Sequence, residues 1–257
     1  MDRMPVLFVG HGSPMNAISD NRYTNEWKRI AKSIPRPKAI LSFSAHWYTK
    51  GTKIMNSEDP KTVHDIYGFP QELYDLDYRV NGAPWLSRKA SELITKTTQF
   101  DQSWGIDHGT WSVLVHLYPE RDVPVVQVSI DAEASLQEQY EIGCQLKTLR
   151  EQGVLIFASG NIVHNLGRVN WEMPEQGYEW ANEFDYYIYE NIMSRNHDGI
   201  LNYPQLGSIA HLAVPTQDHF LPLLVALGAS DDTDQIEVFN QSGELGSLSM
   251  TSYLIGV

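Results

Sequence analysis

The sequence predicts an α/β fold, a three-layer α/β/α sandwich around a central, mostly parallel (mixed) sheet. Short runs that are almost continuous in apolar and β-branched residues are typical of strands covered on both faces. Longer amphipathic stretches alternate with these runs, as crossover helices do. There is no low-complexity tract and no repeat at a fixed period. We therefore expect one domain over residues 1–257.

The elements follow from the same pattern, taken in chain order. Four runs predict the central strands: Pro5–Gly10, Ala39–Trp47, Val123–Ile130 and Gly153–Gly160. Helical spacing of apolar residues predicts five helices: Tyr23–Ser33, Pro84–Lys96, Thr110–Tyr118, Ser135–Glu151 and Trp180–Arg195. A further helix is expected to start at Pro215 and Thr216. Two C-terminal segments, Ile236–Gln241 and Ser247–Val257, are expected as further strands, antiparallel ones at an edge of the sheet.

The charge balance argues against two classes of partner. The chain of 257 residues has 19 Lys and Arg against 32 Asp and Glu, a formal charge of −13. This charge repels phosphate backbones and anionic lipids, so we expect no nucleic acid and no membrane partner. No segment approaches the roughly 20 apolar residues of a membrane span, and the first apolar run is too short for a signal peptide. These features favour a cytoplasmic protein and leave the oligomeric state open.

The single cysteine predicts neither a disulfide nor a thiolate site. Cys144 lies in the helical pattern of "YEIGCQLKTL". We interpret it as a small buried apolar residue, whose thiol pKa burial would raise, rather than as a nucleophile. One cysteine also excludes a thiolate-rich metal site.

Three histidines follow or close predicted strands. His11 lies between two glycines after the first strand, His46 closes the second, and His164 follows the fourth. Ligands of open α/β sheets bind outside the carboxyl ends of the strands, and neighbouring strands lie about 5 Å apart. These imidazoles are therefore predicted to share one site, with Asn161 and Asn165 as candidates to orient the ring of His164.

Six further positions complete the nine histidines. His219, beside Asp218, is expected in the first turn of a helix, where the helix dipole lowers its pKa and keeps it neutral for metal binding. His108, in the turn of "WGIDHGTW", suits either proton transfer or a structural role. His64 is expected on a loop over the site, with a structural role favoured. The remaining histidines are predicted to be structural or exposed: His116, His197 and His211.

Other catalytic motifs are missing from the sequence. It has no GxSxG, P-loop, HExxH or GxGxxG motif. Imidazoles from separate segments around one divalent ion are therefore the best-supported constellation. The substrate-binding residues stay unknown, because the aromatic residues of "DIYGFP" and "WGIDHGTW" suit a pocket wall and ordinary core packing equally.

Six motifs in order give the chain a family resemblance. They are "GHGSPMN", "SAHWYT", "VHDIYGFP", "WGIDHGTW", "SGNIVHNL" and "DHFLPLL". From about Pro5 to "GSLSM" the chain resembles the 4,5-DOPA extradiol dioxygenase branch of the LigB-like class III ring-cleavage dioxygenases. The resemblance implies an oxidoreductase that inserts O2 into a catechol such as DOPA and yields a ring-opened semialdehyde.

By position, the resemblance also implies the roles of the histidines. His11, His46 and His219 would bind one divalent metal ion, Zn²⁺ or Fe²⁺. His164 would be the catalytic acid/base, exchanging a proton with a catechol hydroxyl, or else a fourth metal ligand. His108 would be a second catalytic imidazole.

One departure from the superfamily leaves the metal open. Ring-cleaving members elsewhere complete the ligand set with a glutamate, where this chain has His219. Two histidines and a carboxylate suit Fe²⁺ oxygen chemistry, whereas three imidazoles suit zinc equally well. Two alternatives therefore stay open: a zinc-dependent hydrolase, and a non-enzymatic, Memo-like binding protein on the same fold.

Overall fold

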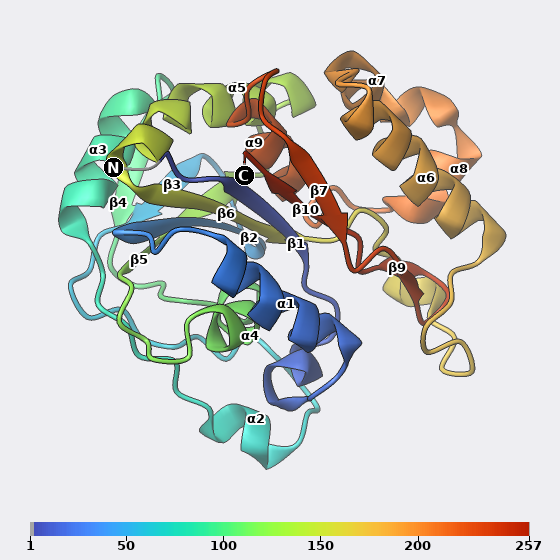
Figure 1. Cartoon of the computed structure of the whole chain (residues 1–257), viewed down its shortest axis with the longest axis horizontal. Coiled ribbons are helices and arrows are strands. Elements are labelled where there is room, and N and C mark those ends of the chain that lie inside the picture. Colours follow the sequence, from blue (N-terminus) through green and yellow to red (C-terminus); the bar gives the residue numbers. More distant parts are fainter. Residues whose placement is uncertain (1–2, 257) are drawn as a thin grey trace.

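A computed structural model describes residues 3–256 of the chain and contains a central sheet between two layers of helices (Figure 1). The sheet has eight strands in the order β4-β3-β5-β2-β6-β1-β10-β7. Their bounds are β1 (Val6–Gly10), β2 (Ala39–Thr49), β3 (Thr52–Met55), β4 (Thr98–Asp101), β5 (Val125–Asp131), β6 (Val154–Gly160), β7 (Ile236–Phe239) and β10 (Ser252–Ile255). A separate hairpin pairs β8 (Gly243–Glu244) with β9 (Leu248–Ser249).

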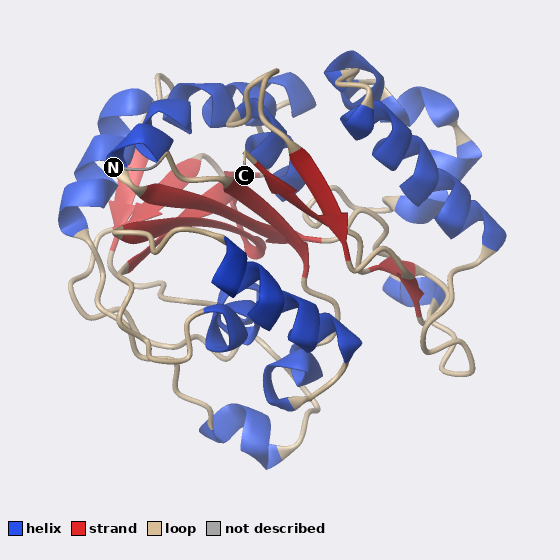
Figure 2. Ribbon diagram, in the orientation of Figure 1, coloured by secondary structure: helices blue, strands red, loops and turns tan. Residues whose placement is uncertain are grey.

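The helices pack on both faces of this sheet (Figure 2). The α-helices are α1 (Arg22–Ser33), α2 (Gln71–Asp75), α3 (Pro84–Leu93), α4 (His108–Leu117), α5 (Leu136–Leu146), α6 (Glu179–Met193), α7 (His197–Leu201), α8 (Ser208–Ala213) and α9 (Leu221–Gly228). Four short 3-10 helices complete the described chain: Pro14–Ile18, Lys147–Gln152, Leu166–Arg168 and Tyr203–Leu206. None of the helices in residues 3–256 is both long and apolar enough to span a membrane.

The hydrophobic core has two parts, because successive side chains along each strand point to opposite faces of the sheet. In β1, Val6 and Phe8 belong to the cluster that includes side chains of α3, α5 and α9, whereas Leu7 and Val9 belong to the cluster with α1 and α4. Successive side chains of a strand point to opposite faces, so a strand buried on both sides reads as a continuous apolar run. The predicted three-layer sandwich with a mostly parallel sheet is confirmed.

The sheet is parallel at its centre and mixed at its sides. β5, β2, β6 and β1 are parallel neighbours, β10 pairs antiparallel with both β1 and β7, and β3 pairs antiparallel with β5. The two predicted C-terminal strands are therefore antiparallel, with β7 at the edge. The short strands β3 and β4 were not predicted, because each has only four residues and no long apolar run.

Two expectations about local structure were wrong. Cys144 is exposed, because the buried face of α5 is formed by neighbours such as Ile142, Gly143 and Leu146 and the thiol points away from them. The helix expected from Pro215 begins only at Leu221 and is preceded by turns.

The centre of the sheet brings three strand ends together. β6 lies between β2 and β1, and the register aligns Ser44 with Ser159 and Gly10 with Gly160. Because the three strands are parallel, the segments that follow them leave the sheet at one edge. This edge carries His11, His46 and His164.

A buried ion pair ties three distant segments of the fold together. Arg150, which is fully buried, contacts Asp234 at 2.6 Å. The same guanidinium donates to the carbonyl oxygens of Met4 at 2.7 Å and Ala229 at 3.0 Å. It therefore connects the entry to β1, the end of α9 and the segment before β7.

Replacing this arginine is expected to be strongly destabilising. Arg150→Met leaves two carbonyl oxygens without this donor, and Asp234 keeps its ion pair to Arg3 and the backbone N–H of Asp231. We expect the free energy of unfolding to fall by about 3 kcal/mol or more, measured by urea denaturation. The control is Lys28→Met, which removes an exposed ion pair to Asp20 and should cost less than about 1 kcal/mol. Equal losses in the two variants would contradict this account of the buried pair.

Candidate active site

Five of the nine histidines line one cavity at the carboxyl edge of the sheet. The cavity has a volume of about 760 Å³, which lies within the range of about 300–1,000 Å³ typical of small-molecule sites. The five are the candidates singled out from the sequence: His11, His46, His108, His164 and His219. They come from segments that are up to about two hundred residues apart and that only the fold unites.

One ring nitrogen of His11 faces the cavity, because the other forms a hydrogen bond with a neighbouring strand. Its Nδ1 lies 2.9 Å from Oγ of Ser159 on β6. The Ser159 hydroxyl donates its own hydrogen to the carbonyl of Gly109, so it accepts the hydrogen on Nδ1 of His11. Nε2 of His11 therefore carries a lone pair.

His46 lies within an irregular part of β2, not at its last residue as predicted. Between the pairs Phe43–Val128 and Tyr48–Ile130, β2 has four residues and β5 only one, so β2 departs there from the ladder with β5. The Nδ1 of His46 lies 3.4 Å from the carboxylate of Asp65, which favours a hydrogen on Nδ1 and a lone pair on Nε2.

His219 lies in a turn before α9, not in the first turn of a helix as predicted. Its carbonyl accepts the backbone N–H of Asn161 at 2.9 Å and packs directly on Gly160, where a side chain would not fit. The Nδ1 of its ring donates to the Asp218 carboxylate, which thus turns onto the ring of its neighbour rather than away from it. The Nε2 of His219 is buried and has no hydrogen-bond partner within residues 3–256.

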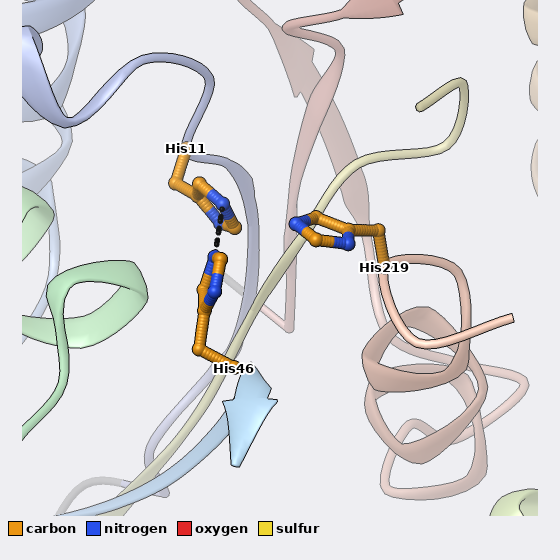
Figure 3. A group of neighbouring side chains, drawn as sticks. All are labelled: His11, His46 and His219. Carbon is orange, nitrogen blue, oxygen red and sulfur yellow. Dashed lines mark hydrogen bonds between the residues drawn. The ribbon is translucent and has the colours of Figure 1, made fainter. Parts of the chain in front are cut away.

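Three ring nitrogens converge in the space between His11, His46 and His219. The Nε2 atoms of His11 and His46 are 3.1 Å apart, and one ligand nitrogen from each of His11, His46 and His219 lies within 4.8 Å of the others (Figure 3). Burial, followed by the neighbouring imidazoles, lowers the pKa of His11 and His46 well below the usual value, so both rings are neutral. Two nitrogens that bind one ion at 2.0–2.1 Å in tetrahedral geometry lie about 3.3 Å apart. The three imidazoles therefore fit a divalent cation.

His164 lies next to this group but outside it. Its ring stacks on the ring of His219 with a centroid distance of 3.4 Å and an interplanar angle of 6°. Burial, with a further contribution from His219, lowers the pKa of His164 to about 3. The side chains of Asn161 and Asn165 do not orient this ring as expected, because they donate to backbone carbonyls of Ser249 and Leu212.

His108 is the first residue of α4, and a carboxylate holds it in place. Its backbone N–H and its Nδ1 each lie 2.9 Å from Asp65, and its ring centroid is 3.8 Å from that of His46. Asp107 caps the helix by accepting the backbone N–H of Thr110. Burial, and then the charge of Asp65, raises the pKa of Asp107 to about 6. Asp65 thus joins two active-site histidines, a role that its position in "VHDIYGFP" does not reveal.

The other four histidines lie away from the cavity. The Nε2 of His64 lies 2.9 Å from the carbonyl oxygen of Leu76, and its ring packs near Trp111. His116 and His197 also have hydrogen-bond partners in the protein, and His211 is exposed. The prediction of structural or exposed roles holds for the geometry of all four.

Apolar and aromatic side chains form the rest of the wall. From "DIYGFP", Tyr67 and Phe69 line the cavity. The tryptophans of "WGIDHGTW" do not, because Trp104 stacks on Trp47 and Trp111 is fully buried. The remaining apolar wall comes from several segments that are distant in the sequence: Pro14, Met15, Ile66, Leu166, Val169, Trp171, Leu245 and Leu248.

Comparison with known proteins assigns the chain to a family. The family model of the catalytic LigB subunit of aromatic ring-opening dioxygenase matches residues 5–256. The chain is 43% identical over 260 residues to a 4,5-DOPA dioxygenase extradiol of Escherichia coli (strain K12), covering 99% of this chain and 95% of that protein. A 4,5-DOPA dioxygenase extradiol of Beta vulgaris is 32% identical, with 96% of this chain and 94% of that protein covered.

A solved structure agrees with this relationship. The crystal structure of an uncharacterized protein from Escherichia coli K12 superimposes with a TM-score of 0.86 at 40% identity, covering 99% of this chain and 100% of that one. The family match extends over nearly the whole chain and includes every histidine of the cavity. The chain therefore belongs to the LigB family of aromatic ring-opening dioxygenases.

Proposed function

We propose that this protein is an extradiol dioxygenase that opens the ring of a DOPA-like catechol, with one divalent metal ion held by His11, His46 and His219. The observation that carries the proposal is the convergence of one ring nitrogen from each of three histidines in a buried space. Uncompensated lone pairs at such short distances repel one another, and a cation removes that repulsion. The names of the relatives support the substrate class.

Ferrous iron is the metal that the family chemistry favours. Insertion of dioxygen needs an ion that exchanges electrons, and zinc has no redox chemistry. When bound, Fe²⁺ would bind the catechol oxygens and activate dioxygen. Zinc at the same imidazoles is the alternative, since three imidazole nitrogens suit it too and would then support hydrolysis.

His164 is proposed as the acid/base. It stands beside the three-nitrogen group, lines the cavity and is neutral, so it can accept a proton from a catechol hydroxyl and return it later. A role as a fourth ligand is the alternative, because His164 also lies within ligand distance of Asp218 and His219.

His108 is proposed as a second imidazole that contacts the substrate. Asp65 accepts the hydrogen on Nδ1 of His108 and leaves Nε2 available in the cavity wall. The same carboxylate lies behind His46, so Asp65 would position both rings. Because the wall of the cavity runs from His11 to Leu248, we also propose that residues 1–257 act as one catalytic domain.

The choice of metal gives the first test of this function. Metal-free protein is loaded anaerobically with Fe²⁺ or with Zn²⁺ and mixed with DOPA in air-saturated buffer. We expect oxygen uptake and a ring-opened product, measured with an oxygen electrode and by absorbance, only with iron. Oxygen uptake that is equal without metal, or hydrolytic activity with zinc alone, would contradict the proposal.

Removal of a proposed ligand should empty the site. His219→Ala leaves two of the three nitrogens, so we expect bound metal to fall from one ion per chain to a small fraction of that, measured by elemental analysis after gel filtration. The exposed His211→Ala is the matched control and should keep its metal. A His219→Ala protein that retains one ion per chain would exclude this residue as a ligand.

The acid/base role makes a different prediction. His164→Ala should keep one metal ion per chain while its turnover falls by about 10²–10⁴-fold, the usual contribution of a general acid/base. Metal content and steady-state oxygen uptake are measured on the same preparation. Loss of metal would make His164 a ligand, and unchanged turnover would remove it from the mechanism.

A further inference from the structure

One carboxyl group in the cavity wall has no role in the site described so far. Glu244 lies on the β8–β9 hairpin and lines the same cavity as the five histidines. Its Oε2 is buried and has no hydrogen-bond partner within the described chain. A buried carboxyl oxygen without a partner costs free energy, so a ligand that supplies one would be bound favourably.

The hairpin holds this carboxyl next to the histidines. A side chain built on Gly12, the neighbour of His11, would come within 2.8 Å of Oε2 of Glu244, so the carboxyl lies against the His11 loop. Across the hairpin, Leu248 forms a backbone bridge with His164. Gly12 has a φ of +59°, and the absence of its side chain gives Glu244 room.

The charges around the cavity leave Glu244 without a cation. Within residues 3–256, no Lys or Arg lines the cavity. The other lining carboxylate, Asp65, is bound to His108, whereas the nearby Glu175 lies 3.7 Å from Arg22. Burial, with a smaller contribution from Glu175, raises the pKa of Glu244 to about 7. A positively charged ligand group beside Glu244 would stabilise its ionised carboxylate against both burial and the repulsion from Glu175.

We propose that Glu244 binds the ammonium group of the substrate's side chain, so that the cavity selects catechols that carry a protonated amine. The inference rests on the proposed ring-cleavage function and assigns a specificity residue to it. The apolar walls and the volume of about 760 Å³ leave room for an aromatic ring with a side chain. A substrate with only a carboxylate on its side chain would find no cation in the wall and would face Glu244.

The test compares substrates in wild type and in Glu244→Gln. The measured quantity is the ratio of kcat/KM for dopamine to kcat/KM for 4-methylcatechol, which has no charge on its side chain. Glutamine keeps the size of the side chain and removes its charge. We expect the ratio to fall by about 10-fold to 100-fold, the size of a hydrogen bond to a charged group. The Glu175→Gln control removes the nearby carboxylate outside the cavity and should leave the ratio within about twofold.

Binding provides a readout that does not need ring cleavage. Tyramine cannot be opened as a catechol, and 3-(4-hydroxyphenyl)propionate differs from it in the charge of the side chain. Calorimetry should show tighter binding of tyramine to wild type, with the preference lost in Glu244→Gln. Circular dichroism establishes that the variant is folded.

The outcomes separate the two proposals. If wild type opens no catechol but prefers tyramine through Glu244, the proposed function fails and the ammonium site stands. If catechols are opened but Glu244→Gln leaves both the kcat/KM ratio and the binding preference unchanged, the ammonium site is wrong and the function stands. Equal losses for dopamine and 4-methylcatechol would also overturn the ammonium site, because Glu244 would then act on the ring or on the fold.

Discussion

The site depends on one electrostatic constraint, which is that the acceptor nitrogens of three largely buried imidazoles point at a common space. Each lone pair is directed inward by a group behind the ring: the Ser159 hydroxyl at His11, and carboxylates at His46 and His219. Histidines that bind metals commonly have such a partner, which fixes the tautomer and the ring orientation. The groups behind the rings are therefore as much a part of the site as the rings themselves.

The fold satisfies this constraint by close approach at the carboxyl edge of the sheet. β2, β6 and β1 are adjacent and parallel, so the segments after them start within a few ångströms of one another. Two glycines, which have no side chain, then allow neighbouring segments to approach closely. A side chain at Gly160 would collide with the carbonyl of His219, and one at Gly109 would lie 2.9 Å from the ring of His46. Both positions bring a segment against the imidazoles without filling the space between them.

The sequence predicted the local elements, but not the individual contacts between residues that are distant in the sequence. Strands, most helices and the histidines at strand ends follow from apolar periodicity and punctuation, so β1, β2, β5 and β6 and the five cavity histidines were found. Asp65 and Glu244 were missed because both lie in segments without regular structure or in a two-residue strand, and their neighbours come from distant parts of the chain. The outward position of Cys144 was missed for a related reason, since helical spacing alone does not say which face another helix covers.

The carboxylates behind the rings also bear on the choice between iron and zinc. Three imidazoles alone would leave the charge of a divalent ion uncompensated, unlike two histidines and a carboxylate. Here Asp218 accepts the hydrogen of His219, and although burial opposes ionisation, this hydrogen bond holds the pKa of Asp218 below its usual value. Its negative charge therefore lies directly behind His219, the third proposed ligand. With this carboxylate the proposed site has a charge balance similar to that of two histidines and one carboxylate, which makes three imidazoles compatible with ferrous oxygen chemistry.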